Sequence, residues 1–263
     1  MDRGMLWNFD RARTFRPMVF NGYRQATVAA VFETPAKTSF LFDLDGTLVW
    51  STASISPCWP GGRRFRRRES NLSIWRIHRK IGMSGGLFTS MRLRETGYQI
   101  DPERIERLRH LHAAAFKRNS ANIQLLPGAR ELLAYLTHAE IPWAIATSGR
   151  IETARQLLAK LDIDLDRIPI VTRDQVKYAK PDPDLFLAAA ARLRVGIETT
   201  LVVGDSVWDM LAAQRARGLC VGLLSGGYGR DELERAGACR VYEDPADLLR
   251  HIDEVGRKRG ADA

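Results

Sequence analysis

At residues 39–47 the chain reads SFLFDLDGT, in which four uncharged residues lead into two aspartates and a glycine. A short, nearly apolar run that ends in turn residues is typical of a strand buried on both faces. Polar groups that directly follow such a strand lie at its carboxyl end, where open parallel sheets bind their ligands. The stretch therefore predicts a central strand that ends in a polar site containing Asp43 and Asp45.

Beyond this stretch, short apolar runs alternate with helical patterns. The predicted strands cover residues 39–43, 142–147, 168–172, 200–205, 219–224 and 240–242. The predicted helices cover residues 128–139, 151–161, 183–194, 207–217, 230–236 and 245–256. Apolar strands separated by helices indicate a parallel sheet that helices cover on both faces. We therefore predict an α/β fold with a doubly wound parallel sheet.

One connection is much longer than the others. It runs from the first strand to Pro127-Gly128, and a loop of that length without secondary structure is unusual inside a compact domain. Helical patterns cover residues 72–82 and 102–118. We interpret residues 51–122 as a helical insertion over the carboxyl edge of the sheet, which leaves residues 38–50 and 123–256 for the core. Residues 1–37 have no place in that core and are predicted to be an extension, either disordered or arising from a mis-assigned start.

Three further polar clusters follow predicted strands or precede predicted helices. They are Thr147-Ser148-Gly149, Lys180-Pro181-Asp182-Pro183 and the stretch from Gly204 through Asp205 to Asp209. Each cluster alone has an ordinary explanation as a turn or a helix cap. Four such clusters at one edge of a sheet are a stronger indication of a catalytic site.

The net charge of +9 is concentrated in two segments. Residues 1–37 carry six cations and three anions, and residues 63–80 carry eight cations and one anion, so the rest of the chain is close to neutral. We find no zinc pattern, aromatic motif or helix-turn-helix signature and expect no nucleic-acid partner. No apolar run has the length of a membrane span, and the three cysteines are widely separated. We therefore expect a cytoplasmic protein with reduced cysteines and no membrane partner.

The four clusters resemble the four motifs of the haloacid dehalogenase superfamily, over about residues 39–255. The segment between the first strand and the second motif is similar in place to the cap of its phosphoglycolate-phosphatase-like and beta-phosphoglucomutase-like branch. This resemblance implies a Rossmann-like core, Mg²⁺ as the cofactor and an aspartyl-phosphate intermediate. A phosphate monoester is anionic, and a bound cation would offset its repulsion of a carboxylate nucleophile.

The resemblance also implies a role for each polar residue. Asp43 would attack phosphorus, and Asp45 would protonate the leaving alcohol and later deprotonate the water. The implied catalytic residues are Asp43, Asp45, Thr147 and Lys180. Ser148 and Gly149 would bind the phosphoryl group, and the implied metal ligands are Asp43, Asp45 through its backbone carbonyl, Asp205 and Asp209.

The substrate is predicted to be a small phosphorylated metabolite. Within the cap, Arg79 and Lys80 are candidates for binding a second anionic group, although both residues fit equally well as surface charges. Asp45 argues against dehalogenation, which needs no acid at that position. Sugar phosphomutase remains an alternative, as does a weakly active or non-catalytic relic. We expect a monomer or a weak dimer.

Residues 50–64 depart from the family pattern. They read WSTASISPCWPGGRR, which has no helical period and contains two prolines and two adjacent glycines. One permitted set of codons, read two nucleotides later, encodes VDSVYQPVLAWREA, which resembles the family's continuation. We therefore hypothesise a compensated frameshift here, with a divergent loop as the alternative, and the coding DNA distinguishes the two.

Overall fold

The computed structural model describes residues 38–50 and 123–255, together with four single positions between them. These positions, Glu103, Arg107, His110 and Ala114, are helical and exposed. They fall in the predicted helix 102–118, at a spacing that lies along one helix face. The rest of the predicted cap, the anomalous run after Trp50 and the amino-terminal extension lie outside the described residues, so those domain boundaries stay predictions.

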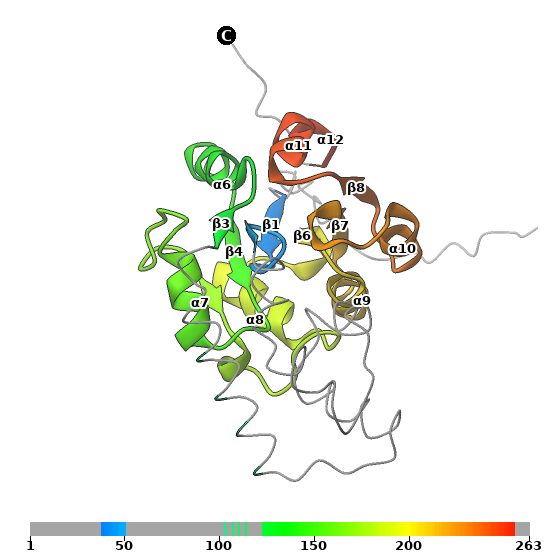
Figure 1. Cartoon of the computed structure of the whole chain (residues 1–263). Helices are drawn as coiled ribbons and strands as arrows, with labels where there is room; N and C mark the ends of the chain where they lie inside the picture. Colours follow the sequence, from blue (N-terminus) through cyan, green and yellow to red (C-terminus); the bar gives the residue numbers. More distant parts are fainter. Residues whose placement is uncertain are drawn as a thin grey trace, which may run out of the picture. The chain divides into compact units, whose positions relative to one another are not determined.

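The core is a six-stranded parallel sheet (Figure 1). Its strands are β1 (Ser39–Phe42), β4 (Trp143–Ala146), β5 (Ile170–Val171), β6 (Thr200–Gly204), β7 (Leu219–Leu223) and β8 (Arg240–Tyr242). They lie in the order β5-β4-β1-β6-β7-β8. The chain therefore builds outward from β1 first on one side and then on the other, which is the doubly wound arrangement. This confirms the predicted fold class.

Helices cover both faces of the sheet. They are α6 (Ala129–His138), α7 (Ile151–Leu158), α8 (Asp184–Leu193), α9 (Val207–Ala216), α10 (Arg230–Arg235), α11 (Pro245–Arg250) and α12 (Ile252–Val255). Alternate residues of β1 belong to two different hydrophobic cores. Phe40 and Phe42 belong to the core that also contains residues of α6, α7, α11 and α12. Leu41 belongs to the core that also contains residues of α8, α9 and α10. All three are fully buried, so β1 is the centre of a three-layer structure.

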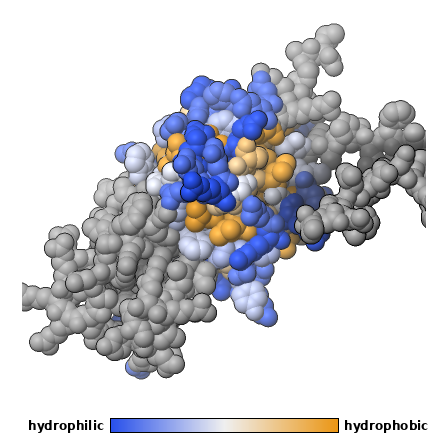
Figure 2. Space-filling model, turned by 90° about the vertical axis from the view of Figure 1, so that its right-hand side faces the viewer, coloured by the Kyte–Doolittle hydropathy of each residue, from blue (hydrophilic) through white to orange (hydrophobic). Residues whose placement is uncertain are grey.

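Large apolar side chains are mostly inside. Figure 2 shows one face of the molecule, on which apolar residues are flanked by hydrophilic ones. Within the described residues, the exposed large apolar side chains are Trp50, Leu165, Tyr178, Leu187 and Leu219. No helix of the described part combines the length and apolar character that crossing a bilayer requires.

The observed elements agree closely with the predicted ones, with three differences. Strand β5 has only two residues, where the sequence predicted 168–172. The predicted helix 245–256 is interrupted at His251, so that α11 and α12 are separate. A small antiparallel pair, β2 (Val49–Trp50) with β3 (Gln124–Leu125), was not predicted. This pair joins the two ends of the segment interpreted as the cap.

Candidate active site

Strand β1 lies where the sheet connections change direction, between β4 and β6. At such a point the connecting segments diverge and leave a crevice at the carboxyl ends of the strands. Asp43 follows β1, Thr147 follows β4 and Asp205 follows β6. The topology therefore brings three of the four sequence clusters to one edge of the sheet.

The turn after β1 reverses the chain within a few residues. Gly46 N–H donates to the carbonyl of Val49 at 2.9 Å, and Gly46 has a φ of +85°, in the region that favours glycine. A Cβ at Gly46 would also collide with the carboxylate of Asp205. The turn directs the next side chain, Thr47, inward, where its hydroxyl donates to Asp205 Oδ1 at 3.1 Å.

Lys180 is a fully buried cation between two aspartates. Its Nζ forms an ion pair with Asp43 Oδ1 and lies 2.7 Å from Asp209 Oδ1. Nζ also lies 5.2 Å from the centroid of the Phe186 ring. Burial lowers the pKa of Lys180, but the two carboxylates outweigh burial and hold that pKa above its usual value. Lys180 therefore stays charged and ties β1, α9 and the loop before α8 together.

Three buried aspartates meet beside this lysine. Asp43, Asp205 and Asp209 each offer a carboxylate oxygen, and these oxygens lie within 4.8 Å of one another. Burial, opposed by Lys180 and reinforced by Asp209, raises the pKa of Asp43 to about 7. Burial and the neighbouring Asp209 and Asp43 also raise the pKa of Asp205 well above its ordinary value. One lysine does not balance three carboxylates in a buried site, so the cluster favours a further positive charge.

A divalent metal ion fits this donor set. The three candidate ligands all present carboxylate oxygens, which hard cations such as Mg²⁺ prefer over the nitrogen and sulfur donors of zinc sites. Three of the four metal ligands that the family resemblance implies, Asp43, Asp205 and Asp209, belong to this cluster. The fourth, the backbone carbonyl of Asp45, stays a prediction.

The loop after β4 lies beside Asp45. Thr147 is buried, and its hydroxyl oxygen accepts a hydrogen bond from Gly149 N–H at 3.0 Å. A Cβ built on Gly149 would lie 3.2 Å from Thr147 Oγ1 and 3.7 Å from Asp45 Oδ2, so the Asp45 carboxylate lies beside this loop. Ser148 and Gly149 are partly exposed. The predicted catalytic and phosphate-binding residues of the core are thus close together.

A residue that the sequence did not single out holds this loop in place. Asp174, which follows β5, accepts a hydrogen bond from Ile151 N–H at 3.0 Å and lies 3.4 Å from Arg150 Nη1. The adjacent Arg173 N–H donates to Gly149 O at 3.0 Å. Helix α7 has no side-chain cap from its own N-cap residue, so Asp174 satisfies an amide at the start of this helix.

Other supporting contacts were also missed. Ser206 Oγ donates to Asp209 Oδ2 at 2.5 Å, and Ser225 Oγ donates to Gly46 O at 2.6 Å. Gly226 follows β7 and lies so close to Asp205 that a Cβ there would collide with its carboxylate. The sequence signal for this last contact was the Gly226-Gly227 pair, one residue beyond the predicted strand 219–224. Arg79 and Lys80, the predicted cap residues, lie outside the described residues.

Comparison with known proteins finds both related sequences and a family model. A family model described as haloacid dehalogenase-like hydrolase matches residues 38–217. Hexitol phosphatase A from Escherichia coli (strain K12) is 34% identical over 179 residues, which cover 67% of this chain and 78% of that protein. Phosphoglycolate phosphatase from Rhodospirillum rubrum is 29% identical over 214 residues, covering 79% of this chain and 88% of that protein.

A solved structure extends the likeness to three dimensions. The crystal structure of a hydrolase from Pseudomonas syringae is 54% identical, with a TM-score of 0.79. The match covers 84% of this chain and 100% of that one.

Proposed function

The chain belongs to the haloacid dehalogenase-like hydrolases, in the branch that resembles phosphoglycolate phosphatases, and from this premise we propose that it is a magnesium-dependent phosphatase of small phosphorylated sugars or similar metabolites. The observation that carries the proposal is the buried cluster in which Lys180 bridges Asp43 and Asp209 beside Asp205. Buried charges are costly to a fold, and such a cluster is expected where chemistry requires it.

In this proposal Asp43 is the nucleophile. Its carboxylate attacks phosphorus, the bond between phosphorus and the leaving oxygen breaks, and the phosphoryl group is transferred to Asp43. Lys180 reduces the repulsion between Asp43 and the anionic phosphoryl oxygens. Thr147, Ser148 and Gly149 hold those oxygens from the loop after β4.

Asp45 is the proposed acid and base. It donates a proton to the departing alkoxide, and the resulting carboxylate then takes a proton from the water that attacks the phosphoryl group on Asp43. The position of Asp45 beside Gly149 supports this role, because the phosphoryl group would lie between that loop and Asp43. Inorganic phosphate leaves and Asp43 is regenerated.

Asp43, Asp205, Asp209 and the carbonyl of Asp45 would hold the metal ion. When bound, Mg²⁺ supplies positive charge that orients the phosphoryl group and offsets the negative charge of the transition state. Thr47 and Ser206 hydrogen-bond to Asp205 and Asp209, and so restrict the orientation of two of the proposed ligands.

The substrate class comes from the relatives. The names of the compared proteins include hexitol phosphatase, phosphoglycolate phosphatase and phosphorylated carbohydrates phosphatase. All three names describe hydrolysis of a small phosphate monoester, which supports a hydrolase rather than a phosphomutase. We propose that residues 51–122 form the cap that selects the substrate, with Arg79 and Lys80 as candidates for binding a second anionic group.

The direct test is phosphate release from p-nitrophenyl phosphate and from a set of sugar phosphates, with and without Mg²⁺. Asp43→Asn keeps the shape of the side chain and removes its nucleophilic charge, so turnover should fall by roughly 10⁴-fold or more. Asp231→Asn, an exposed position on α10, is the matched control. Unchanged turnover in Asp43→Asn would reject the mechanism, and interconversion of sugar phosphate isomers would identify a mutase instead.

A further inference from the structure

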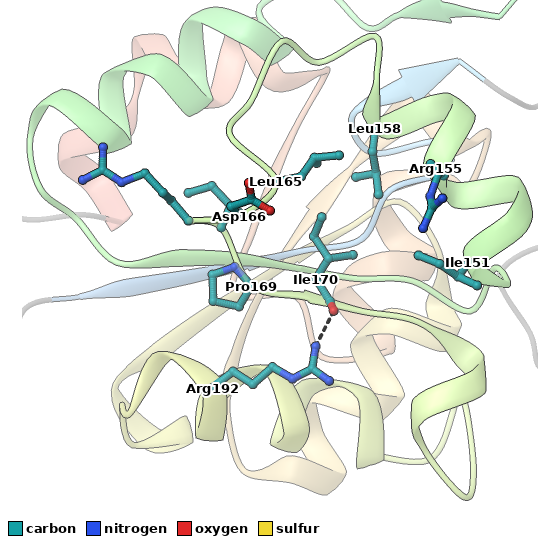
Figure 3. Close-up of a pocket in the computed structure, with 10 residues that line it drawn as sticks. Ile151, Arg155, Leu158, Leu165, Asp166, Pro169, Ile170 and Arg192 are labelled. Atoms are coloured by element: carbon teal, nitrogen blue, oxygen red, sulfur yellow. Dashed lines mark hydrogen bonds between the residues drawn. The ribbon is translucent and has the colours of Figure 1, made fainter.

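An open groove lies beside the edge strand β5, at the end of the sheet opposite β8 (Figure 3). Its walls come from α7, α8 and the segment that leads into β5, and its volume is about 420 Å³. Small-molecule sites typically have volumes of roughly 300–1,000 Å³. Apart from Ile151, whose N–H donates to Asp174, no residue named in the candidate active site lines this groove.

The floor of the groove is apolar. Leu158 of α7, Pro169 and Ile170 line it, and Leu165 adds a side chain that is 43% exposed. Covering an exposed leucine with an apolar group is favourable, because it removes apolar surface from water. The floor therefore favours a ligand with an aromatic or aliphatic body.

The rim of the groove is cationic. Arg155 comes from α7 and Arg192 from α8, on the two sides of Ile170 (Figure 3), and Arg167 precedes β5. Asp166 is the one carboxylate among the lining residues, so the lining carries two positive charges in excess. Among the residues that the structure describes, none of these arginines has a carboxylate within ion-pair distance. Arg192 donates to the backbone carbonyl of Ile170, which leaves its other N–H groups for a ligand.

We propose that this groove binds a small amphipathic anion, in which a phosphate, sulfonate or carboxylate group is attached to an apolar body. The guanidinium groups of Arg155 and Arg192 recognise the anionic group, since a planar guanidinium matches the oxygens of such groups. The apolar body lies on Leu165, Pro169 and Ile170. This site is independent of the proposed phosphatase chemistry.

The probe that tests the proposal is 8-anilinonaphthalene-1-sulfonate, an aromatic body with one sulfonate, titrated by fluorescence against the full chain. Arg155→Met and Arg192→Met remove the charge and keep an apolar stem, and each should weaken binding by up to about fivefold. The double variant should lose about tenfold or more. Arg235→Met, at an exposed position on α10, is the control and should leave the affinity unchanged.

A neutral probe of the same shape, N-phenyl-1-naphthylamine, separates the two parts of the site. It should bind the arginine variants as it binds the wild type and bind Leu165→Ser less well. Equal sulfonate binding in the double variant and in Arg235→Met would overturn the proposal. The same loss for the neutral probe in the double variant would also overturn it, because arginine would then act through packing and not through charge. Circular dichroism of each variant verifies that it is folded.

Discussion

Two clusters in the described core pair aspartate with a cation in opposite surroundings. Around Lys180, the side chains of the lysine, Asp43 and Asp209 are at most 5% exposed. Around Asp247, the partner Arg250 is 64% exposed and the aspartate itself 16%. Each cluster joins an aspartate to a cation at hydrogen-bond distance, and burial is the clearest difference between them.

The difference shows why contact geometry alone does not reveal function. An exposed ion pair contributes about 0–1 kcal/mol, because water already solvates both charges. A buried pair gives up that solvation, and well-packed apolar residues in its place are often as stable or more so. The Lys180 cluster is therefore a poor way to stabilise the fold and a reasonable way to prepare a site for an anion and a metal ion. The Asp247 cluster, by contrast, secures the start of a short helix.

The largest effect is expected from leaving the buried cluster without its cation. Lys180→Met keeps the volume and removes the charge, so Asp43 and Asp209 remain buried without their shared partner. The free energy of unfolding should fall by about 3–5 kcal/mol, and turnover by roughly 10²–10³-fold. Urea denaturation and phosphate release measure the two losses.

The matched change in the exposed cluster is Arg250→Met. It should alter the free energy of unfolding by less than about 1 kcal/mol and leave turnover unchanged. Equal destabilisation by the two substitutions would contradict the contrast between the clusters.

A smaller effect is expected on metal dependence. Asp205→Asn keeps an oxygen that can accept from Thr47 and removes one anionic metal ligand. The Mg²⁺ concentration that gives half-maximal rate should rise by at least about tenfold, and Mg²⁺ should raise the melting temperature less than in the wild type. Asp231→Asn should behave as the wild type in both measurements. An unchanged Mg²⁺ requirement in Asp205→Asn would remove this residue from the metal site.

The sequence predicted the strands, strand ends and helices that carry the two clusters, because these depend on local pattern. Apolar runs located every strand of the main sheet, and turn residues at strand ends located Asp43, Thr147 and Asp205, because topology places such ends together. A helix was predicted over 245–256, and α11 begins there at Pro245, but its end at His251 was not predicted.

The unpredicted contacts join segments that are distant in sequence. Ser225 donates to a carbonyl 179 residues away, and Asp174 caps a helix that begins 23 residues before it. Both contacts depend on which strands are neighbours and on their register, and periodicity within one segment carries no information about either. The short β5 was over-predicted because an apolar run shows how far burial extends and not how far strand pairing extends.

A moderate effect is expected from releasing the loop after β4. Asp174→Ala removes the acceptor for Ile151 N–H, and kcat/KM should fall by up to about tenfold as Thr147 and Gly149 lose their fixed position. Asp174→Asn keeps an acceptor and loses only the charge opposite Arg150, a pair that is largely exposed, so it should retain most of the activity. Equal losses in the two variants would indicate that the charge matters and not the hydrogen bond.

The smallest effect is expected at Asp247. The backbone N–H of Glu243 donates to its carboxylate at 3.0 Å and, with help from Arg250, lowers its pKa below the ordinary 3.8. A lowered pKa in the folded state means that the ionised carboxylate stabilises the fold above its ordinary pKa, and that this contribution is lost as the pH falls through the folded value. Asp247→Asn should therefore lower the free energy of unfolding by less than about 1 kcal/mol at neutral pH. The gap should close in acid, because protonation makes the wild-type side chain neutral as well. Urea midpoints measured from neutral to acid pH test this prediction. A difference between the wild type and Asp247→Asn that stays constant with pH would mean that the hydrogen bonds of Asp247, and not its charge, stabilise the helix. Of the two clusters, only the one around Lys180 would then depend on charge.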